Sequence, residues 1–263
     1  MSAFQGSPEW LAQRTGRVTG SRVAAALGVS KYATKDDLMR EMVREHFAAE
    51  REFTGNEATE HGQAHEDDAI DLYEQQTGQG ILYTGQHIHP EHDWLAASPD
   101  GLVGSDGLIE VKCPYRGTYT TAADVPHYIA QMQLQMAVTG RKWCDFVIWR
   151  NDSILIDRVD AEPFWLDERM PTLQAFIDDY RATIASEELS ARHLMPLIRE
   201  DKEWAKAERN YLLAKKEADE AAMVLDDAKA ELIALAGEQS QKGRAVQVIR
   251  SERKGSVAYA KAI

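Results

Sequence analysis

Cysteine is scarce in this sequence, and long apolar runs are absent. The two cysteines among 263 residues, Cys113 and Cys144, provide no disulfide framework. No stretch approaches the roughly 18 to 20 consecutive apolar residues of a membrane-spanning helix. The first residues, MSAFQGSPEW, lack the basic and apolar regions of a signal peptide. The sequence therefore argues against a disulfide-rich secreted protein or a membrane protein, and a cytoplasmic protein without a membrane partner is expected.

Basic residues are also in deficit. Lys and Arg number 30 against 43 Asp and Glu, for a net charge of −13, which argues against a protein that coats nucleic acid without specificity. The deficit is uneven, because residues 201–263 carry 12 basic and 11 acidic side chains, and residues 242–263 carry six and one. An acidic body with a basic tail can still bind DNA in a local positive channel.

Helical and strand patterns alternate along the first 195 residues. Apolar spacing, N-caps and glycine stops predict helices over residues 7–14, 19–28, 34–48, 55–78, 124–140 and 170–185. Apolar runs between turn signals predict strands over residues 81–89, 94–103, 107–113, 143–149 and 153–159. Helices around a central set of strands make an α/β or α+β domain, which we assign to residues 1–198.

A different pattern begins near residue 201. Residues 201–236 contain no Gly or Pro, and apolar residues and alanines recur at alternating intervals of three and four from Trp204 to Leu235. This heptad pattern predicts a coiled-coil-like helix roughly 54 Å long. Residues 243–263 predict a β-hairpin that turns at Lys254-Gly255, with basic charge that either touches DNA or stays solvated. We assign residues 199–263 to a C-terminal arm that promotes self-association or holds DNA.

Charged residues interrupt the apolar stretch SPDGLVGSDGLIEVKCPY at residues 98–115. Two turn sequences, SPDG and GSDG, fold this stretch into a hairpin that brings Asp100 beside Glu110. Glu110 and Lys112 are two residues apart, so they project from one face of the strand. Buried charge is costly unless it is paired or bound to a metal, and Mg²⁺ prefers carboxylate oxygens. The hairpin therefore predicts a divalent-cation site, with a structural ion pair as the alternative.

The spacing P-D-x9-E-x-K, from Pro99 to Lys112, resembles the PD-(D/E)-x-K nuclease superfamily. Five segments together resemble the lambda-exonuclease/YqaJ-type viral recombinase family over about residues 8–180: EWLAQRTGRVTGSRVAAALG, HGQAHEDDAIDLYE, SPDGL, LIEVKCPY and YIAQMQLQM. The resemblance implies a restriction-endonuclease-like core, with a central mixed sheet flanked by helices. The C-terminal long helix and β-hairpin lie outside it.

The resemblance also implies roles for individual residues. Asp100, Glu110 and Glu66 are expected to bind the catalytic metal, Mg²⁺, with Mn²⁺ as a substitute. Lys112 is expected to be the active-site lysine, and Gln131 matches the glutamine that follows the motif in this family. The sequence pattern alone is equally compatible with Gln131 as an ordinary polar residue on a helix.

Helical spacing independently favours Glu66 over its acidic neighbours. Glu66 shares one helical face with Gly62, Ile70 and Tyr73, and the glycine is expected to allow close approach to the sheet. The neighbouring acids are expected on a solvated face: Asp67, Asp71 and Glu74.

A phosphate-binding group is expected near the N-terminus. The resemblance implies that Arg14 and Ser21 contact phosphate, and Ser98 is assigned the same role. Independently, a helix that begins near Ser21 offers free backbone N–H groups to an anion, with Arg14 and Arg17 close by. An ordinary N-cap with solvated arginines is the alternative.

Histidines raise the question of a zinc site. His61 and His65 are spaced as i and i+4, but HGQAHE matches neither H-E-x-x-H nor its inverse. His87 and His89 alternate on one strand face, and His92 follows them, a pattern compatible with a surface. A zinc hydrolase is therefore disfavoured.

The resemblance implies a function. It implies a Mg²⁺-dependent exonuclease that digests the 5′-ended strand at double-stranded DNA ends in a bacterial or phage-infected cell. The 3′ single strand that remains would serve a phage-type single-strand annealing protein, and the enzyme is expected to be a homo-oligomer, a ring-shaped trimer. Two alternatives stay open: an endonuclease on the same core, which fold and motif do not distinguish, and a non-catalytic DNA-associated assembly protein that acts through its C-terminal helix.

Overall fold

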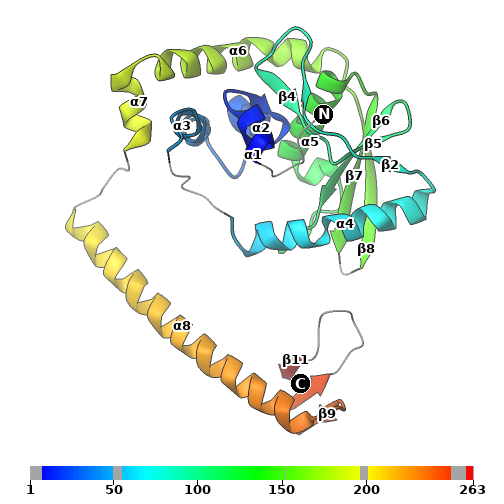
Figure 1. The fold of residues 1–263 in the computed structure, drawn as a ribbon, viewed down its shortest axis with the longest axis vertical. Coiled ribbons are helices and arrows are strands. Elements are labelled where there is room, and N and C mark those ends of the chain that lie inside the picture. The colour runs from blue at the N-terminus through cyan, green and yellow to red at the C-terminus, as the bar shows by residue number, and fades with distance from the viewer. Residues whose placement is uncertain (1–7, 50–54, 151, 196–200, 250–258, 263) are drawn as a thin grey trace. The chain divides into compact units, whose positions relative to one another are not determined.

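The computed structural model describes residues 8–49, 55–150, 152–195, 201–249 and 259–262 (Figure 1). The chain divides into two compact units, Met1–Pro196 and Leu197–Ile263. Within the described ranges, no helix combines the length and the apolar character that a bilayer crossing requires.

The first unit contains helices on both sides of a sheet. Its helices are α1 (Pro8–Arg14), α2 (Gly20–Leu27), α3 (Lys35–His46), α4 (Glu57–Thr77), the 3-10 turn η1 (Ala122–Asp124), α5 (Pro126–Thr139), α6 (Trp165–Ile184) and α7 (Glu187–Leu194). Its strands are β1 (Val18–Thr19), β2 (Ile81–Leu82), β3 (His87–Ile88), β4 (Leu95–Ala97), β5 (Gly101–Val103), β6 (Gly107–Lys112), β7 (Trp143–Arg150) and β8 (Ser153–Asp160).

A five-stranded sheet forms the centre of this unit, in the order β2-β5-β6-β7-β8. β6 and β7 run parallel, whereas the other neighbours are antiparallel, so the sheet is mixed. A second sheet has the order β1-β4-β3, with β1 parallel and β3 antiparallel to β4. The predicted fold class, a central mixed sheet flanked by helices, is confirmed.

Helices α4 and α5 cover opposite faces of the central sheet. Ile109 and Val111 of β6 belong to the buried cluster that includes Tyr73 of α4, whereas Leu108 belongs to the cluster that includes helix α5. Because side chains alternate between the two faces of a strand, Glu110 lies on the α5 face. The charged end of β6 is therefore directed toward α5.

Helix α2 packs closely on α5 because small residues line it. Ala24 and Ala26 are buried in the same cluster as Leu134 of α5. A Cβ added to Gly20, the first residue of α2, would lie only 3.3 Å from the Cγ of Gln135. This glycine allows the N-terminus of α2 to reach the glutamine-bearing face of α5.

The predicted helix ends are confirmed at three glycines. Gly28, Gly78 and Gly140 follow α2, α4 and α5 with φ of 77°, 68° and 67°, the left-handed conformation that glycine adopts without strain. The prediction of one helix over residues 170–185 is incomplete, since α6 begins at Trp165 and α7 follows it as a separate helix.

Two predicted strands are each divided between two sheets. The prediction of a single strand over residues 81–89 is wrong, because β2 pairs with β5 and β3 pairs with β4. The predicted strand over residues 94–103 breaks into β4 and β5, which also lie in different sheets. Apolar alternation marks an extended chain but carries no information about which strand it pairs with.

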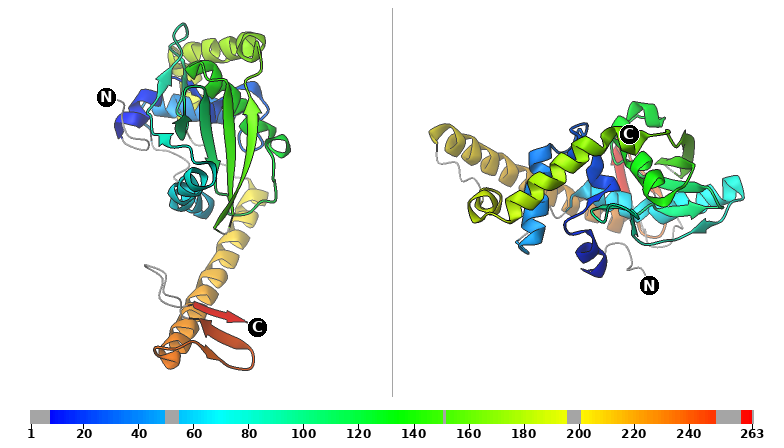
Figure 2. Two further views of the ribbon diagram at one scale, coloured as in Figure 1. Left: turned by 90° about the vertical axis from the view of Figure 1, so that its right-hand side faces the viewer. Right: turned by 90° about the horizontal axis from the view of Figure 1, so that it is seen from above.

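The second unit contains one long helix and a small sheet. Helix α8 (Lys202–Ala236) is continuous over 35 residues, which confirms the predicted C-terminal helix (Figure 2). Strands β9 (Gln241–Lys242), β10 (Val246–Ile249) and β11 (Tyr259–Ala262) form a sheet in the order β11-β10-β9. β10 and β11 pair antiparallel, as predicted, while the predicted turn at Lys254-Gly255 lies outside the described residues.

Candidate functional site

The β5–β6 hairpin places Asp100 beside the end of β6. Gly101 pairs with Ile109 across the hairpin, and the Asp100 carboxylate accepts a hydrogen bond of 2.7 Å from the backbone N–H of Val111 at Oδ2. Asp100 is half-buried, and Glu110 on the neighbouring strand is only 1% exposed. The structure thus brings these two carboxyl groups together, as the turn sequences predict.

Three side chains hold the buried Glu110 carboxylate. Lys112 Nζ and Gln131 Nε2 donate to Oε1, the latter at 2.6 Å, and Gln135 Nε2 donates to Oε2 at 2.7 Å. Gln135 was not anticipated from the sequence. Its separation from Gln131 by four residues puts both on one helical face, and that spacing in YIAQMQLQM is a signal that could have revealed it.

Glu66 reaches the same site from α4. It is half-buried and lines the same pocket as Asp100, Glu110 and Lys112. Ile70 and Tyr73, on its side of the helix, are buried as expected. Gly62 does not make the expected close approach, because a Cβ there would meet no atom within 4 Å.

The neighbouring acids of α4 behave less uniformly than predicted. Asp67 and Asp71 are exposed, in agreement with a solvated face. Glu74 is an exception, because its Oε1 accepts a hydrogen bond of 2.6 Å from the backbone N–H of Ile81. Glu74 therefore has a structural role in fixing the start of β2.

Mutual repulsion among the carboxyl groups shifts their proton affinities. Burial and the neighbouring Glu110 carboxylate raise the pKa of Asp100 well above its ordinary range, against the opposing effect of Lys112. Burial also raises the pKa of Glu66, with Lys112 opposing and Glu110 adding to the shift. These groups therefore resist carrying full negative charge together without a compensating cation.

Lys112 supplies part of that compensation. Burial alone would lower the pKa of its ammonium, but the carboxylates of Glu110 and Asp100 raise it above the ordinary value. The Nζ also lies 5.1 Å from the centre of the Tyr128 ring, a cation–π distance. Lys112 is therefore protonated at neutral pH in this arrangement.

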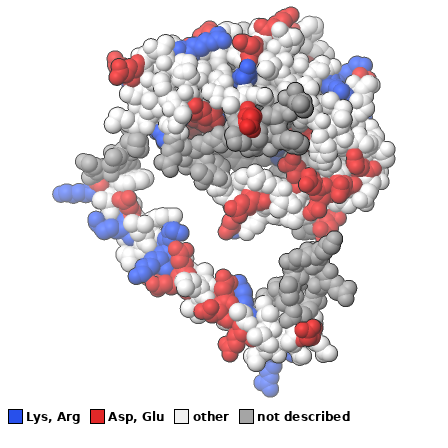
Figure 3. Space-filling model, viewed as in Figure 1, with Lys and Arg blue, Asp and Glu red and all other residues white. Residues whose placement is uncertain are grey.

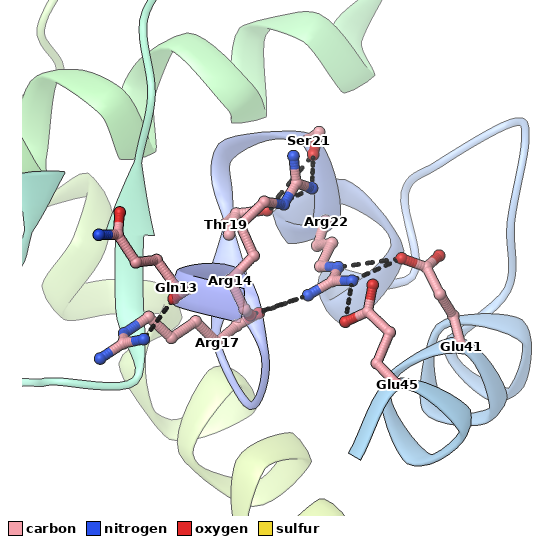
Figure 4. A network of polar contacts seen from close by, with 8 residues as sticks. All are labelled: Gln13, Arg14, Arg17, Thr19, Ser21, Arg22, Glu41 and Glu45. Atoms are coloured by element: carbon pink, nitrogen blue, oxygen red, sulfur yellow. Dashed lines mark hydrogen bonds and ion pairs between the residues drawn. The ribbon is translucent and has the colours of Figure 1, made fainter. Parts of the chain in front are cut away.

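A pocket of ≈ 400 Å³ connects the carboxyl groups with the N-terminus of α2. Arg14, Ser21 and Ser98 also line this pocket. Arg14 Nη2 donates to Ser21 Oγ at 3.0 Å and to Thr19 Oγ1 at 3.3 Å (Figure 4). The predicted phosphate residues and the predicted catalytic residues thus face one pocket.

Arg17 is the exception among the predicted phosphate residues. Its Nε donates to the carbonyl of Asp93 at 2.8 Å, and its Nη1 donates to the carbonyl of Gln13. Arg17 is a described residue that does not line this pocket. Its guanidinium instead contacts the backbone carbonyls of Asp93 and Gln13, and its contact with phosphate stays a prediction.

A second pocket of ≈ 630 Å³ continues from the first. Several residues line both: Tyr32, Glu66, Val111, Lys112 and Tyr128. Its outer part is formed by Tyr115, Arg116 and Tyr119, together with the start of α4. Glu66 therefore borders both pockets, whereas Asp100 and Glu110 line the first one.

The histidines make other contacts. His65 stacks on Trp149 with ring centres 4.0 Å apart and pairs with Asp68 at 3.2 Å. His87 Nε2 lies 2.8 Å from Thr84 Oγ1, and His89 stacks on His92. These imidazoles are engaged with aromatic and hydroxyl partners at separate places on the molecule.

The donor chemistry of the pocket fits a hard divalent cation. Carboxylate oxygens come from three elements, β6, α4 and the turn before β5, and burial, together with the nearby Glu110 carboxylate, raises the pKa of Asp100 and Glu66. Among the described residues, no three His, Cys, Asp or Glu side chains are already gathered at metal-ligand spacing. Lys112 donates directly to Glu110 in this arrangement.

Solved structures resemble this chain over about two thirds of its length or more. An alkaline exonuclease of Laribacter hongkongensis is 34% identical, with a TM-score of 0.61, and the match covers 72% of this chain and 100% of that one. A structure of the same enzyme in complex with dAMP matches at 33% identity with equal coverage. A phage-related exonuclease from Haemophilus somnus has the same fold, with 18% identity, a TM-score of 0.53, and 64% and 95% coverage.

Sequence comparisons agree on the family. An uncharacterized protein of Acanthamoeba polyphaga mimivirus is 26% identical over 160 residues, and this match spans 54% of the present chain but only 28% of the viral protein. The family model of the YqaJ-like viral recombinase domain matches residues 9–142, which include Arg14, Glu66, Asp100 and Glu110. The predicted resemblance is therefore confirmed, and the chain belongs to the YqaJ-like viral recombinase domain family.

Proposed function

We propose that this protein is a divalent-metal-dependent exonuclease that hydrolyses the 5′-ended strand of duplex DNA ends. One observation carries the proposal: the carboxyl groups of Asp100, Glu110 and Glu66 share a pocket with Lys112 and with the Arg14–Ser21 pair. Phosphodiester hydrolysis needs charge compensation at the reacting phosphate, and both acidic and basic side chains line the pocket. The alkaline exonuclease of Laribacter hongkongensis, a relative, supports this activity.

Asp100, Glu110 and Glu66 would hold the metal, Mg²⁺ or Mn²⁺. A bound divalent cation supplies Lewis-acid stabilisation of charge on the phosphate and lowers the pKa of bound water. Their carboxylate oxygens suit these hard cations better than a soft one.

The other residues of the pocket orient these carboxylates and the substrate. Gln131 and Gln135 fix both oxygens of Glu110 from α5. The Lys112 ammonium would donate to a phosphate oxygen and stabilise the negative charge that builds there.

The acidic and basic side chains of the pocket favour one direction for the bound strand. The Arg14 guanidinium, with Ser21 and Ser98, would hold a terminal 5′ phosphate. The scissile phosphate would then lie beside the carboxylates, and the rest of the strand would extend along the second pocket. Release of a nucleoside monophosphate follows from this arrangement, and a relative of this chain has been observed in complex with dAMP.

The acidic surface is compatible with this substrate. On the face shown in Figure 3, acidic side chains gather over α4, and such a surface repels the phosphate backbone. DNA binding would therefore be confined to the basic side chains of the pocket and to local positive patches. This confinement favours a substrate that enters by its end.

Three further features belong to the proposal. The product would be a 3′ single strand, a single-strand annealing protein would be the partner that receives it, and the active form would be a homo-oligomer, a trimer. Residues 199–263 would aid self-association or DNA retention. The product and its partner rest on the family, whereas the oligomer and the role of the arm rest also on the exposed apolar side chains of α8 and on the basic composition of residues 242–263.

The deciding experiment compares linear and covalently closed circular duplex DNA in the presence of Mg²⁺. Wild type should degrade only the linear form, and a 5′ label should be released before an internal or 3′ label. Cleavage of the closed circle would instead identify an endonuclease on the same core. If the protein binds DNA but cuts neither the linear nor the circular form, it is a non-catalytic assembly protein.

A further inference from the structure

A buried arginine contacts the backbone of Arg14, one of the predicted phosphate residues. Arg22, the residue after Ser21 in α2, is only 4% exposed and points toward Glu41 and Glu45 of α3 (Figure 4). Its Nε and Nη2 donate to Glu41 Oε1 at 3.1 and 2.6 Å, and Nη2 lies 2.6 Å from Glu45 Oε2. Both glutamates belong to α3, so the guanidinium joins α2 to α3.

The remaining donor of Arg22 holds the segment that carries Arg14. Nη1 donates to the carbonyl oxygens of Arg14 and Arg17, each at 3.2 Å. Arg14 is the last residue of α1, where backbone carbonyls have no partner within the helix. Arg22 therefore caps the C-terminal end of α1 and the turn that follows it.

The geometry requires a guanidinium. Burial alone would lower the pKa of Arg22, but the Glu41 and Glu45 carboxylates raise it overall. A planar fork with five donors serves two carboxylates and two carbonyls at once, whereas the ammonium of lysine has three donors at one point. A buried ion pair is a poor source of stability compared with apolar packing. Because the Arg22 guanidinium also contacts the backbone of Arg14, we expect it to fix the position of that backbone.

We infer that Arg22 is a positioning residue for 5′-phosphate recognition. It fixes the backbone of Arg14 against α3, and the Arg14 side chain then reaches Thr19 and Ser21 at the edge of the pocket. Arg22 itself touches no substrate. The inference rests on the proposed function, because it assigns Arg14 to the terminal phosphate.

The test measures discrimination between 5′-phosphorylated and 5′-hydroxyl ends. The ratio of kcat/KM on the two linear duplexes is compared for wild type, Arg22→Lys and Glu41→Gln. The relative Kd of the same two duplexes, measured by fluorescence anisotropy in EDTA, provides a readout that is independent of catalysis. Because a charge-assisted hydrogen bond to phosphate accounts for roughly a ten- to hundredfold effect, Arg22→Lys should reduce both ratios by about tenfold.

Arg44→Lys is the matched control. Arg44 is also on α3, and its Nη1 donates to the carbonyls of Leu194 at 2.8 Å and His193 at 3.4 Å, at the end of α7. The control removes a similar arginine-to-carbonyl contact away from the pocket, so it should lower thermal stability without changing either ratio. A change in stability alone is thereby separated from a change in phosphate recognition.

The outcomes separate this inference from the function on which it rests. A folded Arg22→Lys with wild-type ratios would overturn the inference while leaving the exonuclease intact. If Arg22→Lys fails to fold, Glu41→Gln decides: Glu41 is 55% exposed, the substitution keeps its shape, and unchanged ratios would overturn the inference. If wild type cleaves linear DNA without preferring a 5′ phosphate, the inference is also overturned. If wild type does not cleave DNA at all, the proposed function is refuted. In that case the ratios of Kd measured in EDTA would still decide the role of Arg22.

Discussion

The β5–β6 hairpin and helix α8 place their charged residues in opposite environments. In the hairpin, Glu110 is buried and three side chains hold its two oxygens. In α8, charges pair along an open helix surface, as between Lys215 and Asp219 at 3.4 Å and between Lys229 and Asp226 at 2.8 Å. Exposed pairs of this kind contribute only about 0.3–0.5 kcal/mol each, whereas an unpartnered buried charge costs several kcal/mol.

The apolar residues of the two regions differ in the same way. Ile109 and Leu108 beside Glu110 are fully buried, while Tyr211, Leu225 and Leu235 of α8 are 67%, 56% and 77% exposed. The hairpin is therefore packed on its apolar side chains, and its charges have partners within the fold. The surface of α8 is one on which another surface can pack.

Removal of a hairpin charge should have the largest effect. Asp100→Ala, Glu110→Ala and Lys112→Ala should each lower the rate of DNA hydrolysis on the order of 10²- to 10⁴-fold while the fold is retained. The matched control is Asp106→Ala in the same hairpin, since the Asp106 side chain is 46% exposed and forms its ion pair with Lys142 at 3.1 Å, at the surface. Nuclease rates near wild type in any of the three variants would remove that residue from the site.

Metal exchange should show which cation the hairpin carboxylates select. Dialysis against EDTA should abolish hydrolysis, and Mg²⁺ or Mn²⁺ should restore it. Ca²⁺ should inhibit, because its coordination shell is larger and looser. Full activity without metal, or recovery with Zn²⁺ alone, would contradict an all-oxygen ligand set.

Gln135→Leu should have an intermediate effect. The substitution leaves Glu110 Oε2 buried without its donor, at a cost of about 1–3 kcal/mol, and hydrolysis should fall about ten- to a hundredfold. Gln133→Leu is the control on the same helix, because Gln133 donates instead to the carbonyl of Asp160 at 2.8 Å and accepts from the N–H of Glu162. Equal activity losses in both variants would show that Gln135 acts only through stability.

Asp100→Asn should change the pH dependence of stability in metal-free protein. The pKa of Asp100 is raised on folding, so its contribution is fully present below its unfolded value of about 4 and is lost as the pH rises through the folded value. Wild type should therefore lose stability relative to the Asn variant as the pH increases from 4. A difference of roughly 1 kcal/mol corresponds to about 2–4 °C in Tm at this chain length.

Thermal scans in EDTA at several pH values measure this difference. It should increase toward neutral pH and shrink when Mg²⁺ is added. Asp106→Asn is the control and should show a constant offset. A constant offset for Asp100→Asn as well would mean that the carboxyl group titrates normally.

Removal of the second unit should have the smallest effect on the chemical step. A chain that ends at residue 200 keeps the described site, so metal-dependent cleavage should persist at a similar rate. Its mass by light scattering or its salt-sensitive DNA affinity should fall if the arm associates or holds DNA. An insoluble or inactive truncation would show instead that α8 belongs to the nuclease fold.

Short-range sequence rules account for much of the site. The turns in SPDGLVGSDGLIEVKCPY and the period of two along β6 were sufficient to predict that Asp100, Glu110 and Lys112 meet. The helix ends at Gly28, Gly78 and Gly140 also follow from one residue each. These features depend on backbone preferences over a few positions, so the local sequence is enough.

Contacts between residues far apart in the sequence could be found only in the folded structure. Gln135 meets Glu110 across 25 positions, Arg22 meets Glu41 across 19, and Arg17 turns to the carbonyl of Asp93 across 76. The sequence by itself determined the hairpin, the extent of α8 and the identity of the charged residues. Only the tertiary structure decided which partner each charge has, because side chains so far apart along the chain meet only when α2, α3 and α5 pack at specific distances, as Gly20 permits for α2 and α5.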